Sequence, residues 1–486
     1  MLNQLLRNTA LVVIFHFTFI AVTVAQTNAE RIDELMGIYA ELGKFNGSIL
    51  VADQGKVIYK GGYGFANMEW EISNEADTKH RLGSVTKQFT SMLILQLVEE
   101  GKLKLDVPIS TYLPDYPKEK GDKITLHHLL THTSGIPNYT AFPGFFQDVS
   151  RDPYTIDEFV LFFSEKDLDF EPGERFSYSN SGYFLLGVVL EKTTGNTYEE
   201  LLHERIFEPL LMTSTGFDHH ETILKKRAGA YERNNAGDYV NAAYLDMSIP
   251  YAAGSMYSTV EDLFLWDQGL HANSLISVEM KKLMFTEHIP TSGTHYGYGF
   301  GISDLKISED ESVRVIGHGG GINGFNTIIK RVPEHKQLVV LLNNTGGTNL
   351  NKMYDEIIAI LYGQEYELPK KSLANGFLEV IRDEGIKKGK QWFDKTKDDD
   401  AYALDETELN KVGYILLREG MIKEAISVFT INTEEFPKSA NTYDSLGEAY
   451  LADKNKEEAL KNYKKVLEIH PFDSRVKKIV KELEGQ

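Results

Sequence analysis

The stretch that decides the fold runs from His80 to Asp106 and reads HRLGSVTKQFTSMLILQLVEEGKLKLD. Between Phe89 and Val98 the apolar residues recur at helical spacing with little polar relief, which predicts a buried helix. Ser84 stands at the start of this helix, and Lys87 follows three residues later. A buried lysine is costly. Either its side chain reaches solvent, or the protein uses an amine beside that serine.

The spacing of Ser84 and Lys87 permits a chemical role. Residues three apart lie on one face of a helix, so the lysine nitrogen can come within hydrogen-bond reach of the serine oxygen. A free serine is a poor nucleophile, and a lysine amine can activate it if desolvation lowers the lysine pKa. The helix N-terminus would also favour an anionic transition state beside the serine. Alone, S-x-x-K is a common pattern that carries little weight.

Strand patterns lie on both sides of this helical region. A helix is expected first, then a hairpin around Gln54-Gly55, and three antiparallel strands followed by an amphipathic helix come much later in the chain. Strands at both ends with helices between them predict an α+β fold, in which one antiparallel sheet is flanked by helices and carries a helical subdomain. In order, the expected segments other than the hairpin are residues 29–42, 313–316, 326–331, 337–342 and 352–361.

Two further motifs change the weight of S-x-x-K. PGERFSYSNSGY contains Tyr178-Ser179-Asn180, and VIGHGGGING contains His318-Gly319-Gly320-Gly321. Together the three motifs resemble, in order, the S-x-x-K, Y-x-N and K-T-G or H-T-G elements of serine hydrolases related to class C β-lactamases, penicillin-binding D-alanyl peptidases and a group of esterases. ITLHHLLTHTSGIP, AAGSMYSTVEDLFLW and YGYGFGI extend this resemblance over residues 46–361. It implies a β-lactamase/transpeptidase-like fold.

The resemblance also implies a role for each matching residue, and it implies neither a metal nor a cofactor. Ser84 would be the nucleophile, Lys87 the amine that helps to deprotonate it, and Tyr178 the phenol that passes the proton to the leaving group. The phenol's role would depend on cationic neighbours that make its phenolate accessible. Substrate binding would fall to Asn180, His318, Gly320 and Gly321, with the backbone N–H groups of Ser84 and Gly321 forming the oxyanion hole.

The third motif departs from the β-lactamase pattern. His318 stands where those enzymes generally have a lysine that holds the substrate carboxylate, and a histidine is mostly neutral at pH 7. Gly319 also replaces a threonine whose hydroxyl commonly contacts the substrate. We therefore expect a serine hydrolase that acts on a small peptide, amide or ester, with peptidase or esterase activity favoured over β-lactamase activity. The acyl group could pass to water or to another acceptor.

Three other patterns could indicate a different class of protein or site. HGGG also occurs in α/β-hydrolase lipases, but the G-x-S-x-G nucleophile elbow that those enzymes need is absent from this sequence. The same glycines fit G-x-G-x-x-G, yet a strand-like segment follows them and not a phosphate-binding helix. His128 and His132 are spaced for zinc, with His127 adjacent. Their family-like surroundings favour a structural role.

The last part of the chain is repetitive. Four pairs of positions share a spacing of 34 residues, in which small residues would let two helices cross closely, aromatic residues would fill the gap and proline would end the second helix. The pairs are Gly413 and Gly447, Ala425 and Ala459, Phe429 and Tyr463, and Pro437 and Pro471. This pattern predicts two tetratricopeptide repeats over about residues 406–474.

The expected domain order follows from these repeats and from a change in composition after Tyr366. Residues 26–365 would form the hydrolase, residues 366–405 a linker and a capping helix at about 373–396, and residues 406–486 the repeat domain. Such repeats usually bind peptides or partner proteins, although a brace for the first domain is equally consistent. The rival interpretation of the whole chain is an interaction protein with a vestigial hydrolase domain.

The length, charge and composition of the chain limit the possible folds and partners. A chain of 486 residues is too long for one compact core, and its net charge of −20 argues against a nucleic-acid partner. Residues 1–25 have the layout of a signal peptide cut after Ala25, which predicts an exported protein, periplasmic or secreted. The sequence has no cysteine, so the fold must hold without disulfides.

Overall fold

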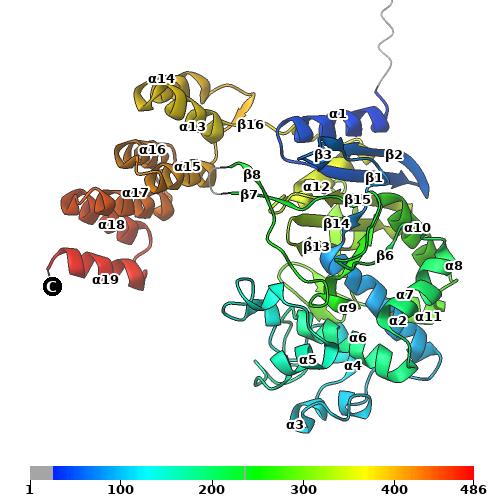
Figure 1. The fold of residues 1–486 in the computed structure, drawn as a ribbon. Helices are drawn as coiled ribbons and strands as arrows, with labels where there is room; N and C mark the ends of the chain where they lie inside the picture. Colours follow the sequence, from blue (N-terminus) through cyan, green and yellow to red (C-terminus); the bar gives the residue numbers. More distant parts are fainter. Residues whose placement is uncertain (1–25, 235–236, 486) are drawn as a thin grey trace, which may run out of the picture.

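The computed structural model describes residues 26–234 and 237–485, and the predicted signal peptide at residues 1–25 lies outside this described part. An α+β unit is followed by a column of helices beside it (Figure 1). Within the described ranges, no helix is both long enough and apolar enough to span a bilayer.

One eight-stranded antiparallel sheet forms the centre of the first unit, in the order β10-β11-β12-β13-β14-β15-β1-β2. Strand β1, near the N-terminus, pairs with β15, near the end of the unit, with Gly47 opposite Asn343. The expected single sheet made from both ends of the unit is therefore confirmed. Its strands are β1 (Gly47–Asp53), β2 (Lys56–Tyr63), β10 (Ile289–Pro290), β11 (His295–Tyr296), β12 (Gly301–Lys306), β13 (Ser312–Ile322), β14 (Phe325–Val332) and β15 (Gln337–Asn343).

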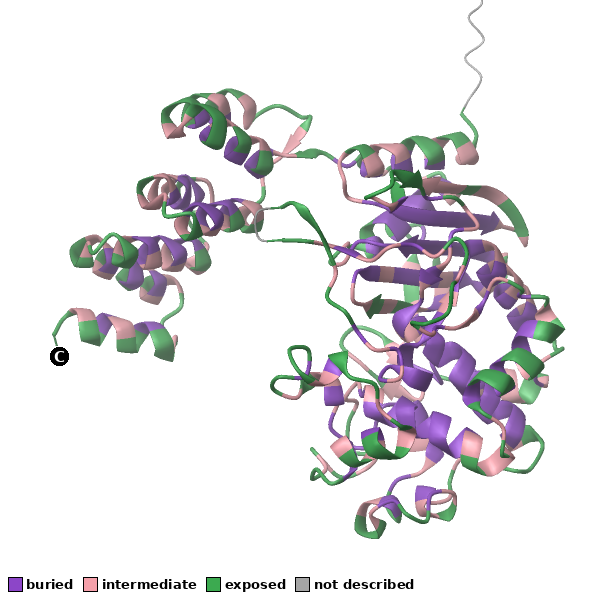
Figure 2. Cartoon of the chain, in the orientation of Figure 1, coloured by how far each residue is buried: buried purple, intermediate pink, exposed green. Residues whose placement is uncertain are grey.

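Strands β1 and β15 are buried along almost their whole length (Figure 2). In β1, Ile49 and Val51 pack into the core under α1 (Asn28–Glu41) and α12 (Leu350–Leu361). Leu50 and Ala52 point the other way, into the larger core. Successive side chains of a strand alternate between faces, so a strand covered on both sides reads as a continuous apolar run.

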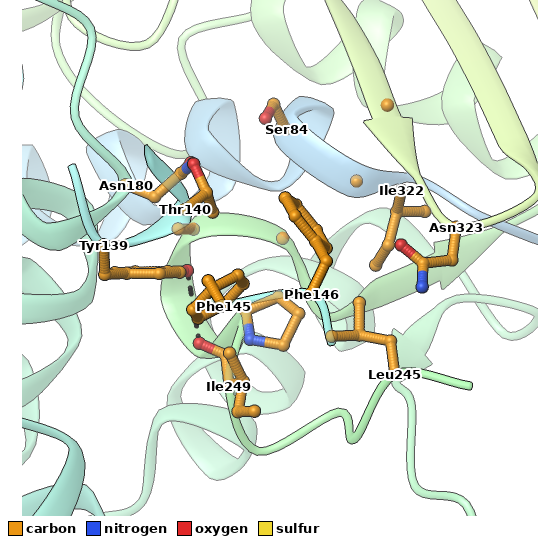
Figure 3. A pocket seen from close by; sticks show the side chains of 15 residues that line it. Ser84, Tyr139, Thr140, Phe145, Phe146, Asn180, Leu245, Ile249, Ile322 and Asn323 are labelled. Atoms are coloured by element: carbon orange, nitrogen blue, oxygen red, sulfur yellow. Dashed lines mark hydrogen bonds between the residues drawn. The ribbon is translucent and has the colours of Figure 1, made fainter. Parts of the chain in front are cut away.

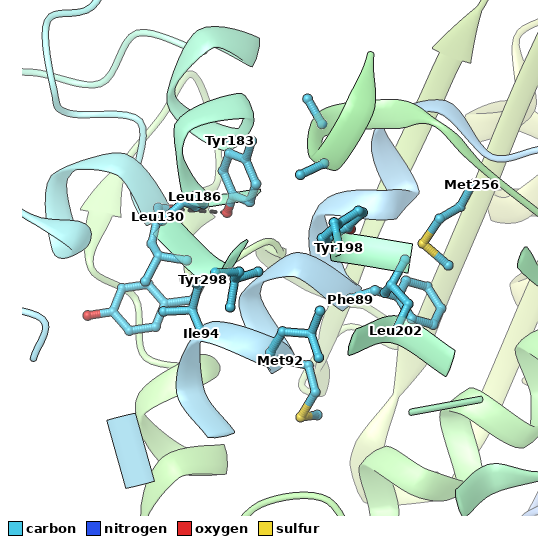
Figure 4. Close-up of a cluster of buried hydrophobic side chains, with 14 of the residues drawn as sticks. Phe89, Met92, Ile94, Leu130, Tyr183, Leu186, Tyr198, Leu202, Met256 and Tyr298 are labelled. Carbon is cyan, nitrogen blue, oxygen red and sulfur yellow. Dashed lines mark hydrogen bonds between the residues drawn. The ribbon is translucent and has the colours of Figure 1, made fainter. Parts of the chain in front are cut away.

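Helix α2 (Thr86–Glu99) lies in the middle of the larger core, and every residue from Thr86 to Leu97 is buried. Figure 4 shows its Phe89, Met92 and Ile94 among apolar side chains from several other helices. The ring of Phe89 stacks on that of Trp266 at 4.2 Å between centroids. The helix that carries the S-x-x-K motif is thus held from all sides.

The other α-helices of the first unit surround α2 or lie at its ends. They are α3 (Lys118–Gly121), α4 (Leu126–Leu130), α5 (Ile156–Ser164), α6 (Asn180–Thr194), α7 (Tyr198–Leu202), α8 (Glu208–Leu210), α9 (Tyr251–Gly254), α10 (Val260–His271) and α11 (Val278–Met284). Short helical turns are η1 (Gly83–Val85), η2 (Ile109–Thr111), η3 (Tyr139–Ala141), η4 (Val149–Arg151), η5 (His203–Phe207) and η6 (Pro333–His335). Short strands outside the main sheet are β3 (Phe65–Asn67), β4 (Ile72–Ser73), β5 (His80–Arg81), β6 (Gly216–Phe217), β7 (Tyr231–Arg233), β8 (Tyr239–Asn241) and β9 (Met256–Ser258).

The column of helices begins after a crossing segment in which β16 (Lys371–Ser372) pairs with β17 (Tyr402–Ala403). One helix was expected over residues 373–396, and this prediction was wrong: the chain forms two. Gly385, with φ of +82°, separates them because glycine adopts positive φ without steric cost. The helices are α13 (Leu373–Glu384), α14 (Ile386–Thr396), α15 (Glu406–Arg418), α16 (Ile422–Glu435), α17 (Ala440–Ala452), α18 (Lys456–Ile469) and α19 (Ser474–Leu483).

The predicted repeat positions meet in space. A methyl group on Gly413 would clash with the ring of Phe429, and one on Gly447 would lie 3.0 Å from the ring of Tyr463. In both helix pairs the glycine therefore leaves room for the aromatic ring. This arrangement is compatible with two tetratricopeptide repeats, which stay a prediction.

Candidate active site

Ser84 lies on η1, the tight turn that leads into α2. The preceding Gly83 has φ of +53°, a left-handed conformation that favours glycine, and a Cβ there would lie 3.0 Å from the carbonyl oxygen of Gly321. The Thr327 hydroxyl donates a hydrogen bond to the carbonyl of Leu82 at 2.8 Å. These contacts hold the turn against β13 and β14, which fixes the position of the serine.

Lys87 is completely buried, and its Nζ lies 3.0 Å from Ser84 Oγ. The same nitrogen lies 2.8 Å from Asn180 Oδ1 and 2.7 Å from the carbonyl oxygen of Ala253. Burial lowers the pKa of Lys87 well below its usual value, which favours the neutral amine. A neutral amine has two N–H groups, and the two acceptor oxygens take both of them. The lone pair of the nitrogen is then left to accept the Ser84 proton.

The orientation of the Asn180 amide follows from a backbone contact. The backbone N–H of Asn180 donates to Asn138 Oδ1 at 3.1 Å, and Asn180 Nδ2 donates to the same oxygen at 3.3 Å. Asn180 therefore turns its own oxygen toward Lys87. Asn138 was missed by the sequence analysis, because no motif marks it, although it directly follows the HTSGIP stretch.

Tyr178 lies beside both chemical residues of the S-x-x-K motif, Ser84 on η1 and Lys87 on α2. Its hydroxyl forms a hydrogen bond with Ser84, and Lys87 Nζ lies 5.0 Å from the centre of its ring. Burial raises the pKa of Tyr178 well above its usual value, and the bond to Ser84 opposes this only in part. In the free protein, burial thus favours the protonated phenol, which runs against the expectation that cationic neighbours make a phenolate accessible.

The third motif lies on β13, next to η1. His318 is half-buried, and its Nε2 lies 3.0 Å from the hydroxyl of Tyr296. Gly320 faces the backbone of Leu82 so closely that any side chain would clash with its carbonyl oxygen. Gly321 lines the same pocket as Ser84. The structure therefore brings Gly321 to the serine, while Gly320 packs behind it and His318 is bonded to a tyrosine.

The pocket beside Ser84 has no charged side chain in its wall (Figure 3). Aromatic rings come from Tyr139, Phe145 and Phe146, while Leu245 and Ile249 approach from another segment. The Tyr139 hydroxyl is used internally, since it donates to the carbonyl of Ile249 at 3.3 Å. The remaining lining residues are small, apolar or neutral and polar: Gly83, Thr140, Asn180, Pro250, Ala253, Gly254, Gly321, Ile322 and Asn323.

The three histidines considered for zinc have other partners. His127 Nδ1 lies 2.8 Å from the Tyr298 hydroxyl, and the ring of His132 packs at a tilt against that of Tyr178, with ring centres 4.3 Å apart. His128 Nδ1 accepts the backbone N–H of Thr125. Within residues 26–234 and 237–485, no group of three or more histidine, cysteine, aspartate or glutamate side chains is arranged to hold a metal ion.

Comparison with known proteins agrees with this geometry. The family described as Beta-lactamase matches residues 29–363. Penicillin-binding protein 4* of Bacillus subtilis is 28% identical over 366 residues, which cover 71% of this chain and 79% of that protein. The structure of a penicillin-binding protein from Bacillus halodurans aligns with a TM-score of 0.60 at 30% identity, covering 68% of this chain and 98% of the other. D-amino acid amidase from Ochrobactrum anthropi SV3 aligns with a TM-score of 0.59 at 26% identity, covering 69% of this chain and 99% of that one.

The fold and the site together define the class of this protein: it is a β-lactamase-fold enzyme of the penicillin-binding-protein-like serine hydrolases. Within that class, the chain belongs to the beta-lactamase family.

Proposed function

We propose that this protein hydrolyses a small amide, peptide or ester through an acyl-enzyme on Ser84, as a peptidase or esterase and not as a true β-lactamase. The observation that carries the proposal is the position of Lys87. Its buried amine lies 3.0 Å from Ser84 Oγ, and its two other neighbours are acceptor oxygens. A vestigial domain has no need to keep a desolvated amine aimed at a serine, so this geometry favours a working enzyme.

The groups around Ser84 can supply each proton transfer that the proposed mechanism needs. Neutral Lys87 takes the proton of Ser84 as Oγ bonds to the substrate carbonyl carbon. The resulting oxyanion accepts hydrogen bonds from the backbone N–H groups of Ser84 and Gly321. When the intermediate collapses, Tyr178 gives its proton to the leaving nitrogen or oxygen, and the Lys87 ammonium restores that proton. Water then attacks the acyl-enzyme ester, and the same groups transfer protons in the reverse order. This step releases the acid and regenerates Ser84.

The wall of the pocket suggests the acyl group. Phe145, Phe146 and Leu245 offer apolar surface, and no lining residue is charged. Burying apolar area contributes about 25 cal/mol per Å², whereas an unpaired buried charge is strongly unfavourable. An uncharged acyl group with an aromatic or aliphatic side chain fits this wall best. One structural relative is a D-amino acid amidase complexed with L-phenylalanine amide. That ligand likewise carries an apolar side chain and an amide.

Covalent labelling tests the proposal. The full-length protein is incubated with a fluorophosphonate or a fluorescent penicillin, and the modified peptide is identified by mass spectrometry. We expect the label on Ser84, no label in Ser84→Ala, and unchanged labelling in Ser73→Ala, an exposed serine on β4. Rates on nitrocefin, a D-alanyl-D-alanine peptide and a phenylacetate ester then rank the activities. A protein that takes no label, or a Ser84→Ala variant that labels equally, contradicts the proposal.

We further infer export from the predicted signal peptide at residues 1–25, and a protein partner for the C-terminal helices. The support for the first is the charge and apolar pattern of that segment alone. The support for the second is the repeated glycine–aromatic packing of α15 with α16 and of α17 with α18.

A further inference from the structure

Three residues form a hydrogen-bonded line behind Tyr178, and the proposed mechanism uses none of them. His132 follows α4, Tyr296 is on β11 and His318 is on β13. His132 Nε2 lies 3.3 Å from the Tyr296 hydroxyl oxygen, and that oxygen lies 3.0 Å from His318 Nε2. His132 and Tyr296 are both buried. This line reaches the strand that borders the site.

A backbone donor fixes the direction of the line at one end. The N–H of Ser179 donates to His132 Nδ1 at 3.1 Å, so that nitrogen carries no proton. Neutral His132 must then carry its proton on Nε2 and donate it to Tyr296. The Tyr296 hydroxyl is left to donate to His318 Nε2.

A backbone acceptor fixes the same direction at the other end. His318 Nδ1 forms a short hydrogen bond with the carbonyl oxygen of Gly319, which can only accept. The His318 proton therefore lies on Nδ1, and Nε2 must accept. Tyr183 also neighbours Tyr296, but its hydroxyl donates to the carbonyl of Leu130 at 2.9 Å. If Tyr296 donated to Tyr183 instead, His318 would have to donate its proton from Nε2 to Tyr296. The bare Nδ1 of His318 would then face the carbonyl oxygen of Gly319, lone pair against lone pair.

The surroundings keep both histidines neutral. Burial is the main cause that lowers the pKa of His318 to about 4. Burial is also the main cause that lowers the pKa of His132 well below its usual value. The titratable groups that face the line are Lys87, Tyr178 and Tyr183, and none of them is an anion that would stabilise an imidazolium.

We propose that His132 and Tyr296 are positioning residues that hold His318 as a neutral ring with both nitrogens occupied, so that the site selects against leaving groups that carry a carboxylate. This inference rests on the proposed function. A carboxylate brought beside His318 would lose its water and find no N–H to replace it. A hydrogen bond to a charged group contributes about 1.5–3 kcal/mol, so its absence predicts roughly tenfold or greater discrimination.

The tautomer can be observed without any turnover. Full-length protein labelled with ¹⁵N-histidine is studied by long-range ¹H–¹⁵N correlation, with His318→Gln supplying the assignment. We expect a proton on Nδ1 and a bare Nε2 that does not titrate from about pH 8 to pH 6. A proton on Nε2, or an ordinary titration in this range, overturns the proposal. Because this measurement needs no acylation, it decides the state of His318 even if Ser84 proves inert.

The selectivity is measured with two matched esters of phenylacetic acid, whose leaving groups are 3-hydroxybenzoate and 3-hydroxybenzamide. The wild-type protein should prefer the neutral leaving group by about tenfold or more in kcat/KM, with no change between about pH 8 and pH 6. In Tyr296→Phe the ring is kept but the donor to His318 is lost. His318 can then take up a proton and bind the carboxylate, so the preference should shrink as the pH falls.

Tyr298→Phe is the matched control, because it removes a buried tyrosine–histidine hydrogen bond, to His127, from the same YGYGF stretch. It should keep the wild-type preference at every pH. A Tyr296→Phe enzyme with the wild-type pH profile, or a wild-type enzyme that shows no preference, overturns the proposed selectivity. Absence of any acyl-enzyme with either ester contradicts the proposed function instead.

Discussion

Two protons decide the chemistry of Ser84. The Lys87 amine lacks one because its side chain is buried, and the Tyr178 phenol keeps one for the same reason. Burial thus favours the uncharged forms of a base and an acid on either side of one hydroxyl. Such pairs of oppositely shifted groups are how enzymes assign acid and base roles near neutral pH.

Asn138 should matter for catalysis although it lies outside the three motifs. Asn138→Ala removes the oxygen that holds both N–H contacts of Asn180, so the Asn180 amide is free to turn away from Lys87. We expect a loss of about tenfold to a hundredfold in the acylation rate, because small misplacements of catalytic groups have effects of this size. Stopped-flow acylation with a phenylacetate ester measures it. An Asn138→Ala variant as fast as wild type would exclude this role.

The sequence predicted the residues that perform chemistry better than those that hold them. As the motifs suggested, Ser84, Asn180 and Gly321 line one pocket, and Lys87 and Tyr178 form hydrogen bonds with Ser84. The supporting residues escaped because their roles depend on contacts across long sequence separations. The hydrogen bonds of Tyr296 with His132 and His318 link three distant segments, and no local pattern records such contacts.

Secondary-structure elements meet at the site through close backbone contacts. Gly83 packs against Gly321, and Gly320 packs against Leu82, so η1 and β13 approach without intervening side chains. Periodicity predicted the buried α2, because its apolar positions continue around the helix. It failed at Gly385, since a single glycine inside a helical pattern does not reveal whether the chain turns there.

The helix pair α15 and α16 offers a test of the close crossing. Gly413→Ala places a methyl group against the ring of Phe429 and should lower the free energy of unfolding by about 1–3 kcal/mol through overpacking. Urea unfolding of the full-length protein followed by circular dichroism measures the change. Adding Phe429→Leu makes room for the methyl group, so the double variant should lose less than the two single losses combined. If Gly413→Ala stabilises by about 1 kcal/mol, as in an open helix, the close crossing is contradicted.

The two parts of the chain have separate cores. The apolar clusters of the first unit contain no residue of α13 to α19, and the clusters of those helices contain none of the sheet. The junction includes a hydrogen bond from Lys44 Nζ to the carbonyl of Lys370 at 3.1 Å and the packing of Arg31 over the ring of Tyr366. The 34-residue repeats and the change in composition after Tyr366 led us to expect two parts, whereas no sequence pattern indicated a contact across the junction.

Removing residues 367–486 should therefore leave a folded hydrolase. We expect kcat/KM for ester hydrolysis and the thermal transition of the first unit to stay unchanged within error, since no residue of the pocket lies in the deleted part. Kinetics and calorimetry of the truncated protein beside the full chain measure this. Loss of the folded state, or a marked fall in kcat/KM, would show that the helices support the active site.

The proposed acylation of Ser84 depends most on a neutral Lys87. The pH dependence of the acylation rate tests this protonation state directly. Because burial lowers its pKa in the folded protein, Lys87 loses its extra proton, and so becomes able to accept one, at a lower pH than an ordinary lysine does. The acylation rate of a neutral ester by wild-type protein should rise with pH and reach its plateau on the acid side of the ordinary lysine range near 10.5. A rate that is still rising within that range would mean that Lys87 is a normal ammonium, and the account would be contradicted.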